Sequence, residues 1–199
     1  MTRGQSPRTI KARRLLDLLA GRPVVLIGMM GAGKTTVGRR LATRLGRTFI
    51  DSDEEIEKAA QMSIPEMFAQ HGEAEFRSGE TRVIARILKE PDIVLATGGG
   101  AYINPETRKI IHEGALTVWI KADPDLLFAR VSKRSNRPLL QTANPRETLQ
   151  TLVDARYPIY AGADVTVLSR DVPHDTVAGD LVDALLAHLT PARDASHVH

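Results

Sequence analysis

An apolar run that leads directly into a glycine-rich loop constrains this chain more than any other feature. The run Val24-Val25-Leu26-Ile27 is followed by Gly28-Met29-Met30-Gly31-Ala32-Gly33-Lys34-Thr35. An apolar run, a glycine-rich octet and a polar restart predict a strand, a phosphate-binding loop and a helix. The glycines at 28, 31 and 33 let backbone amides approach a phosphate chain without an intervening Cβ.

The loop residues predict a nucleotide site with a metal ion. Lys34 provides a point charge for the β- and γ-phosphates, and Thr35 begins the helix, where its hydroxyl can ligate Mg²⁺. The alternative is a glycine-rich turn with an incidental lysine. We expect the nucleotide to be bound by residues of this loop and the following helix start: Gly31, Ala32, Gly33, Lys34, Thr35 and Thr36.

Apolar strands alternate with helical patterns along the rest of the chain, which predicts an α/β fold with a five-stranded parallel sheet sandwiched by helices. Strands are expected at 24–27, 48–51, 93–97, 116–120 and 164–168. Helices are expected after Lys34 up to Gly46, after Asp53, and at 63–70, 75–89, 104–112, 122–131, 145–157 and 176–189. Two insertions, at 54–80 and 132–145, are expected on loops at the carboxyl edge of this sheet, where ligands bind.

The length of 199 residues predicts one domain, at 21–190, with a basic extension at 1–20 and a tail at 191–199. Residues 1–16 hold five bases and no acid, which suits a transit peptide, a basic arm or a mobile tail leading to a short helix at Leu15–Leu19. Of these we favour the mobile tail. Asp17 and Arg22 interrupt any secretory signal, and no apolar run reaches a membrane span.

Charge and composition favour a cytoplasmic protein that binds small anions. The net charge is +3 with acids and bases interleaved, so a nucleic-acid stripe is not expected. The chain has no cysteine, which excludes disulfides and thiolate chemistry and is compatible with a reducing compartment.

Polar and glycine residues follow two strands at their carboxyl ends, where ligands gather in a parallel sheet. Asp51-Ser52-Asp53 ends the second strand, and Gly98-Gly99-Gly100 follows the third, where many phosphate-loop enzymes carry a metal-binding acid. The glycines leave room for a ligand against the main chain. Alternatively, Ser52 or Asp53 caps the next helix.

Two further segments carry charge. Arg77 and Glu80 are three residues apart and can meet on one helix face, often only as a surface ion pair. The basic, proline-broken stretch Lys133-Arg134-Ser135-Asn136-Arg137-Pro138-Leu139-Leu140 reads either as a mobile lid or as a solvated loop.

In their order and spacing, these motifs resemble shikimate kinase, a small kinase of the nucleoside monophosphate kinase type, over about residues 22–189. The resemblance rests on Gly28–Thr35, Asp51-Ser52-Asp53, Phe76-Arg77-Ser78-Gly79-Glu80, Thr97-Gly98-Gly99-Gly100, Asn136-Arg137-Pro138-Leu139-Leu140 and Arg156-Tyr157-Pro158-Ile159-Tyr160. It implies that ATP phosphorylates the 3-hydroxyl of shikimate with Mg²⁺, on the route to aromatic amino acids. It also implies a mobile lid at 132–145 and a substrate-binding flap at 54–80.

The resemblance also assigns the acid-binding residues. Arg77 and Arg156 resemble the pair that binds the carboxylate of shikimate. Asp53 resembles the residue that hydrogen-bonds to the ring hydroxyls and accepts the proton of the attacking one. Asp51 resembles the acid that holds Mg²⁺ through water. The backbone wall of the pocket is implied for Gly98, Gly99 and Gly100.

On the nucleotide side, Arg137 resembles the lid residue that contacts the transferring phosphoryl group opposite Lys34. Arg130 resembles the residue that stacks on adenine. One segment departs from the family. After the last strand many members carry Thr or Asn, then Arg and Pro, whereas this chain has Ser169-Arg170-Asp171-Val172-Pro173. Pro173 is the candidate to clamp adenine. The first 20 residues lie outside the resemblance.

Two other functions remain open at this point. A kinase of another small acceptor, such as gluconate, would keep the phosphate loop and the lid but gives no reason for the acid-binding set. A non-kinase module that binds nucleic acid through the basic tail would also carry the loop, yet it would be expected to have the missing metal-binding acid. We expect a monomer with no nucleic-acid or membrane partner.

Overall fold

The computed structural model describes residues 7–133 and 143–190, which form helices alternating with short strands. The elements in chain order are α1 (Pro7–Leu19), β1 (Val24–Ile27), α2 (Lys34–Leu45), β2 (Thr48–Asp51), α3 (Ser52–Ala60), α4 (Ile64–Ile87), β3 (Ile93–Ala96), the 3₁₀ turn η1 (Ala101–Ile103), α5 (Pro105–Gly114), β4 (Leu116–Ala122), α6 (Pro124–Val131), α7 (Pro145–Tyr160), β5 (Val165–Ser169) and α8 (His174–Leu189).

The strands form one parallel sheet in the order β2-β3-β1-β4-β5, which confirms the expected five-stranded architecture. In its register, Val25 of β1 lies between Leu95 of β3 and Thr117 of β4. From β1 the chain runs outward to β2, and from β3 it crosses to β4 on the other side of β1. The crevice at the carboxyl ends of β1 and β3 is therefore the switch point where ligands bind in such sheets.

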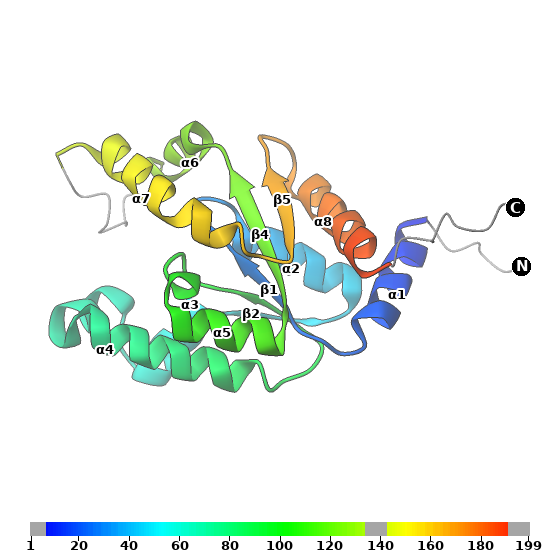
Figure 1. Ribbon diagram of the computed structural model, residues 1–199, viewed down its shortest axis with the longest axis horizontal. Coiled ribbons are helices and arrows are strands. Elements are labelled where there is room, and N and C mark those ends of the chain that lie inside the picture. Colours follow the sequence, from blue (N-terminus) through cyan, green and yellow to red (C-terminus); the bar gives the residue numbers. More distant parts are fainter. Residues whose placement is uncertain (1–6, 134–142, 191–199) are drawn as a thin grey trace, which may run out of the picture.

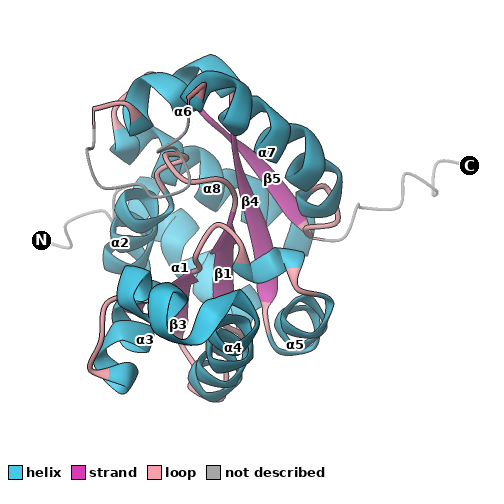
Figure 2. Cartoon of the chain, turned by 90° about the vertical axis from the view of Figure 1, so that its left-hand side faces the viewer, coloured by secondary structure: helices cyan, strands magenta, loops and turns pink. Residues whose placement is uncertain are grey.

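Helices cover both faces of the sheet (Figure 1; Figure 2). Helices α1, α2 and α8 pack together on one face, and α4, α5 and α7 lie on the other. Every residue of β1 and β3 is buried, as expected for strands covered on both faces, which read as continuous apolar runs. Within residues 7–133 and 143–190, no helix has the length and apolarity needed to cross a bilayer.

The N-terminal helix differs from the sequence prediction. Helix α1 begins at Pro7, so the expected mobile tail with a short helix at Leu15–Leu19 is wrong for the described residues. Ala12, Leu15 and Leu19 form an apolar stripe that is buried against the rest of the core. The bases lie on the outer side of this helix, where Lys11 pairs with Asp183 of α8 at 2.7 Å.

Residues 54–80 comprise most of α3, a short turn at 61–63 and the first part of α4, which has one kink. The two helices expected at 63–70 and 75–89 are one continuous element, α4, bent at Gly72, whose φ of 78° is in the left-handed region. The flanking helix α3 packs on α4. A small apolar cluster of Ile56, Met67 and Phe76, separate from the main core, holds the two helices together.

Candidate active site

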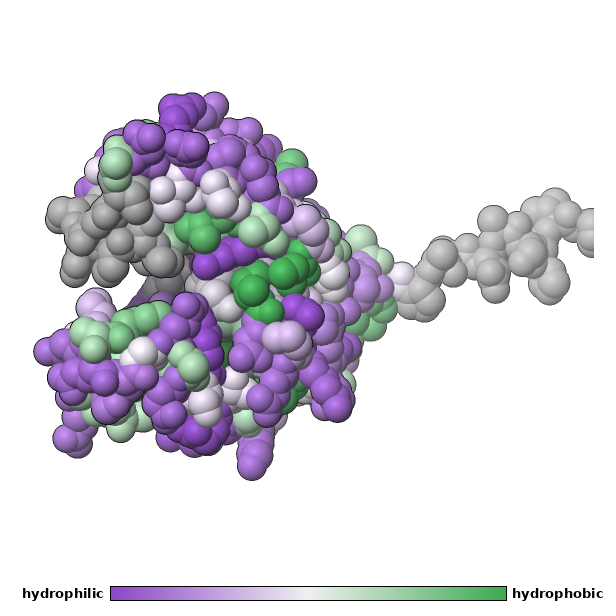
Figure 3. Space-filling model, turned by 60° about the vertical axis from the view of Figure 1, so that its left-hand side comes forward, coloured by the Kyte–Doolittle hydropathy of each residue, from purple (hydrophilic) through white to green (hydrophobic). Residues whose placement is uncertain are grey.

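A cavity of about 520 Å³ lies at the carboxyl edge of the sheet. The space-filling view shows the molecule hollowed on this side (Figure 3). The cavity receives residues from the loop after β1 and the start of α2, the end of β2, the start of α3, the turn after β3, the end of α6 and the start of α8. They are Gly31, Gly33, Lys34, Thr35, Thr36, Asp51, Asp53, Thr97, Gly98, Gly99, Arg130, Val131, Lys133 and His174.

The phosphate loop, residues 28–35, has the expected backbone. Gly31 and Gly33 have φ values of 80° and 94°, a region that a residue with a Cβ reaches only with strain. Lys34 is buried at the start of α2, and its Nζ donates to the carbonyl oxygens of Gly28 at 2.8 Å and Met29 at 2.9 Å. The ammonium group is thereby held at the floor of the cavity, where it can meet an anion.

An oxygen pair beside the loop suits a hard cation. The Thr35 hydroxyl donates to Asp51 Oδ2 at 2.8 Å, and both residues line the cavity. Mg²⁺ is typically held by one or two such oxygen groups together with water and phosphate, so this pair fits the ion. The other oxygen, Asp51 Oδ1, accepts from the backbone N–H of Asp53 at 3.0 Å. The residue that caps α3 is therefore Asp51, and the alternative that Ser52 or Asp53 caps it is wrong.

The turn after β3 brings the acid-binding candidates together. A Cβ added to Gly98 would lie 2.6 Å from Asp53 Oδ1, and one added to Gly100 would lie 2.7 Å from Arg77 Cζ. Only glycine at these two positions allows the carboxylate and the guanidinium to approach the main chain so closely. The turn is tied to α3 by a hydrogen bond from the Gly98 N–H to Ser52 Oγ at 3.1 Å.

Arg77 is held in place by a buried acid. Its Nη1 donates to Glu80 Oε2 at 2.6 Å, and the Glu80 side chain is only 1% exposed, so this is not the surface pair that the spacing suggested. Burial raises the pKa of Glu80, and the adjacent Arg77 charge only partly opposes the rise. The guanidinium also lies over the ring of Phe76, 5.1 Å from its centroid. These contacts pre-organise a cation beside the turn.

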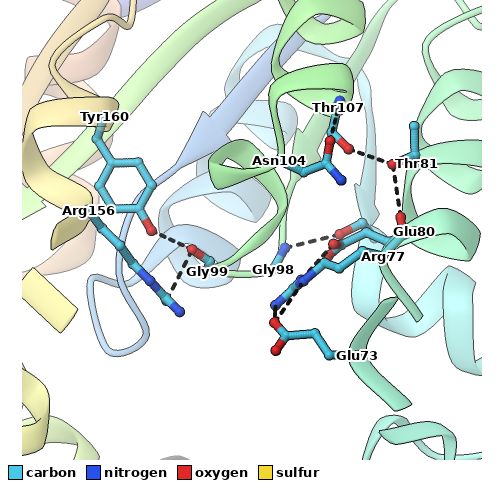
Figure 4. A network of polar contacts seen from close by, with 11 residues as sticks. Glu73, Arg77, Glu80, Thr81, Gly98, Gly99, Asn104, Thr107, Arg156 and Tyr160 are labelled. Carbon is cyan, nitrogen blue, oxygen red and sulfur yellow. Dashed lines mark hydrogen bonds and ion pairs between the residues drawn. The ribbon is translucent and has the colours of Figure 1, made fainter. Parts of the chain in front are cut away.

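Arg156 approaches the same turn from α7. Its Nη1 lies 3.4 Å from the carbonyl oxygen of Gly99, and a Cβ on Gly99 would be 3.7 Å from that nitrogen. Arg156 and Arg77 point toward the same space below Gly98 and Gly99 (Figure 4). The turn, Asp53, Arg77 and Arg156 are called the acid pocket below. It adjoins the phosphate loop, because a Gly99 Cβ would be 3.4 Å from the Met30 nitrogen.

The nucleotide side of the cavity is closed by α6 and by the segment after β5. Arg130 donates to Ser169 Oγ at 2.8 Å, to the Arg170 carbonyl at 2.9 Å and to the Gly31 carbonyl at 3.3 Å. Its guanidinium thus links the phosphate loop to the end of β5. Pro173 precedes α8 and does not line the cavity, whereas the next residue, His174, does.

Most of the predicted site residues share this one region. Ala32 is fully buried and its N–H donates to the Met29 carbonyl at 3.2 Å, so it supports the loop without lining the cavity. Arg137 lies outside the described residues, as does most of the segment predicted to be a lid. The roles predicted for all of these residues stay predictions.

Four residues that line the cavity were assigned no role from the sequence, namely Thr97, Val131, Lys133 and His174, and Glu80 was taken for a surface residue. Lys133 belongs to the basic stretch, and the proline before His174 indicated a helix start. Nothing in the local pattern indicated that either side chain lines the cavity. The Nδ1 atom of His174 is buried with no hydrogen-bond partner among the described residues. Burial, and then the charges of Arg130 and Arg40, lower the pKa of this imidazole.

Comparisons with known proteins agree on one family. The family model described as shikimate kinase matches residues 30–186. The shikimate kinase of Bradyrhizobium diazoefficiens is 53% identical over 175 residues, covering 88% of this chain and 84% of its own. The structure of shikimate kinase from Acinetobacter baumannii in complex with shikimate superposes with a TM-score of 0.82 at 36% identity, covering 87% of this chain and 97% of the other.

The similarity also extends into the N-terminal helix. The shikimate kinase of Bartonella henselae is 50% identical over 194 residues, which is 97% of this chain and 92% of the relative. That coverage takes in α1, so the expectation that the first 20 residues lie outside the resemblance is wrong for this relative. With a family model over most of its length and relatives at about half identity, the chain belongs to the shikimate kinase family.

Proposed function

We propose that this protein transfers the terminal phosphoryl group of ATP to the 3-hydroxyl of shikimate, giving 3-phosphoshikimate and ADP, in the pathway to aromatic amino acids. One observation supports this most strongly: Asp53, Arg77 and Arg156 converge on a glycine turn that packs against the phosphate loop. A ring alcohol bound there lies next to the phosphates of a nucleotide bound at the loop.

The acid pocket matches the chemistry of shikimate, a carboxylated cyclohexene triol. Arg77 and Arg156 bind the carboxylate, because planar guanidinium forks pair with carboxylates in a bidentate geometry. Asp53 accepts hydrogen bonds from the ring hydroxyls and takes the proton of the attacking one. Around the substrate, the main chain of Gly98, Gly99 and Gly100 forms the wall.

Phosphoryl transfer then needs positioning and charge more than covalent help from the protein. The 3-oxygen of shikimate forms a bond to the γ-phosphorus while the bond from that phosphorus to the bridging oxygen breaks, leaving ADP. Lys34 and Arg137 stabilise the charge on the transferring group from opposite sides. Arg130 stacks on adenine, with Pro173 as a further contact for the base.

Magnesium completes the nucleotide site in this proposal. Thr35 and Asp51 would hold the ion, Asp51 through water, and this would offset the missing acid after β3. When bound, Mg²⁺ neutralises charge on the β- and γ-phosphates. The protein's own part is to keep the hydroxyl and the carboxylate adjacent, as their 2.8 Å hydrogen bond already does.

The remaining features of the proposal concern motion and surroundings. A kinase must keep water from the γ-phosphate, so we expect residues 132–145 to act as a lid and 54–80 as a flap that close when both substrates bind. The domain limits of 21–190, the monomeric state, the cytoplasmic location and the absence of nucleic-acid or membrane partners remain predictions.

One assay separates the proposal from its alternatives. ADP release is followed with purified protein, Mg-ATP and, in separate reactions, shikimate, gluconate, a nucleoside monophosphate or RNA. We expect shikimate alone to give rapid turnover, with 3-phosphoshikimate as the product identified by phosphorus NMR. Faster release with gluconate, or stimulation by RNA without an acceptor, would contradict the proposal.

A further inference from the structure

Two tyrosines on α7 donate their hydroxyls to main-chain carbonyls, and only one of these carbonyls belongs to the acid pocket. Tyr157 donates to Ala122 at the end of β4, whereas Tyr160 donates to Gly99 in the glycine turn. Tyr160 is fully buried. Its pKa is raised to about 12 by burial, which the charges of Arg156 and Arg77 only partly oppose. The Tyr160 hydroxyl is therefore a permanent donor at neutral pH.

The same carbonyl is also contacted by Arg156. Arg156 and Tyr160 are one helical turn apart, on one face of α7, and both reach Gly99 (Figure 4). The bond from Arg156 Nη1 to this oxygen is long, at 3.4 Å, and so contributes little. The Gly99 carbonyl is part-buried, and leaving such an oxygen without a hydrogen-bond partner costs free energy, so the Tyr160 hydroxyl sets how strongly the turn retains the arginine.

The part of the turn around Gly99 packs against the phosphate loop. A Cβ at Gly99 would lie 3.4 Å from the Met30 nitrogen and 3.6 Å from the Gly28 oxygen, so this part of the turn rests against the phosphate loop. Tyr160 itself is fixed by its neighbours in an aromatic cluster, with Trp119 at 6.0 Å and Tyr102 at 6.4 Å between ring centroids. Donor and acceptor are thus both held by packing.

We infer that Tyr160 is a positioning residue for the substrate. Because its hydroxyl donates to the Gly99 carbonyl, Arg156 is left free to bind the carboxylate of shikimate. This inference rests on the proposed function, in which Arg156 meets that carboxylate. Without the hydroxyl, Arg156 becomes the remaining protein partner of this part-buried carbonyl and is drawn away from the substrate. The hydroxyl also lies 3.9 Å from Met29 Sδ in the phosphate loop, but a thioether is a weak acceptor, so we expect nucleotide binding to depend little on it.

The test compares Tyr160→Phe with Tyr157→Phe, which removes the same atom from the same helix. For Tyr160→Phe we expect the KM and the calorimetric Kd for shikimate to rise about five- to tenfold, the range expected for one hydrogen bond, with kcat and the KM for ATP within about twofold. Tyr157→Phe should leave the KM for shikimate unchanged, although both variants should melt at a lower temperature. Equal shikimate affinities in the two variants would overturn the inference.

A double-mutant cycle tests whether Tyr160 acts through Arg156. In an Arg156→Ala background, where the arginine is already gone, adding Tyr160→Phe should change the Kd for shikimate by less than about twofold. A full five- to tenfold further loss would show that the hydroxyl acts by another route and would overturn the inference. The Kd for ADP, which should not change, reports that each variant is folded.

The outcome also separates this inference from the proposed function. If the wild-type protein does not phosphorylate shikimate, the proposed function fails and the inference fails with it. If the wild-type protein is active and Tyr160→Phe binds shikimate as the wild type does, only the inference fails.

Discussion

The phosphate loop and the acid pocket lie side by side but are built in opposite ways. The phosphate loop is one continuous stretch, and its lysine is held by local hydrogen bonds, since Lys34 donates to Gly28 and Met29 within the same loop. The acid pocket instead takes one residue each from α3, α4 and α7 around the turn after β3. The first therefore depends on local backbone conformation, and the second on how helices pack around the sheet.

This difference predicts that the two regions can be impaired separately. Changes in the acid pocket should affect shikimate affinity or turnover while the nucleotide still binds, and changes on the nucleotide side should do the reverse. The variants below test that separation.

Asp53→Asn should have the largest effect. The amide keeps the shape of the side chain but cannot take the proton of the attacking hydroxyl, so kcat should fall about 10³-fold. The measurement is coupled ADP release at saturating shikimate and ATP. Calorimetry should find the Kd for ADP within about twofold of the wild type. A near-normal rate would exclude the carboxylate as a base, and lost ADP binding would contradict the separation.

Arg137→Ala tests a residue outside the described part of the chain. Loss of a cation that contacts the phosphoryl group mainly in the transition state should lower kcat about 10²–10³-fold with little change in either KM. Arg134→Ala removes the same charge from the same basic stretch and should lower kcat far less. If Arg137→Ala instead raises the KM for ATP at an unchanged kcat, its predicted role is wrong.

Arg77→Lys sharpens the comparison on the acid side. A lysine keeps the charge but loses the planar fork, so the KM for shikimate should rise about tenfold while the KM for ATP stays constant. The matched control is Arg82→Lys on the same helix, whose side chain is 68% exposed. A parallel rise in the KM for ATP would indicate that the two regions are coupled through the turn.

His174→Ala should have the smallest effect, and on the nucleotide side only. Its buried Nδ1 gains a partner if the nucleotide reaches it, so we expect the Kd for ADP to rise about three- to fivefold with the KM for shikimate unchanged. Because burial and the charges of Arg130 and Arg40 lower its pKa below the ordinary 6.5, the ring is neutral above pH 7. The ratio of the Kd for ADP of the variant to that of the wild type should therefore stay constant from pH 7 to 9. His188→Ala, an exposed position on the same helix, is the control.

Several features could be predicted from sequence because their causes are local. The loop at 28–35, the left-handed cap at Gly46 and the N-cap at Asn104 each depend on residues within a few positions. The strands read as apolar runs, and their alternation with helices implied a parallel sheet. The expected strand positions agree with the structure to within about two residues.

The errors concern residues whose environment comes from distant parts of the chain. Five bases in the first 16 residues suggested a tail, yet α1 is held by Ala12, Leu15 and Leu19, which need α8 and α2 to be buried. Glu80 resembled one half of a surface pair but lies beneath the glycine turn. For His174, no neighbouring residue indicated a place in the cavity.

Residue order alone was enough to specify a phosphate-binding loop, a parallel α/β sheet and a set of motifs typical of one kinase family, because hydrophobic period, caps and glycine backbone preferences act over short distances. That Arg77 and Arg156 meet at residues 98–100 was implied only by the family resemblance, and no residue pattern indicated that Tyr160 shares the Gly99 carbonyl with Arg156. Those contacts exist only when α4 and α7 pack beside the turn after β3, since long-range packing sets both the distances and the burial on which their chemistry depends.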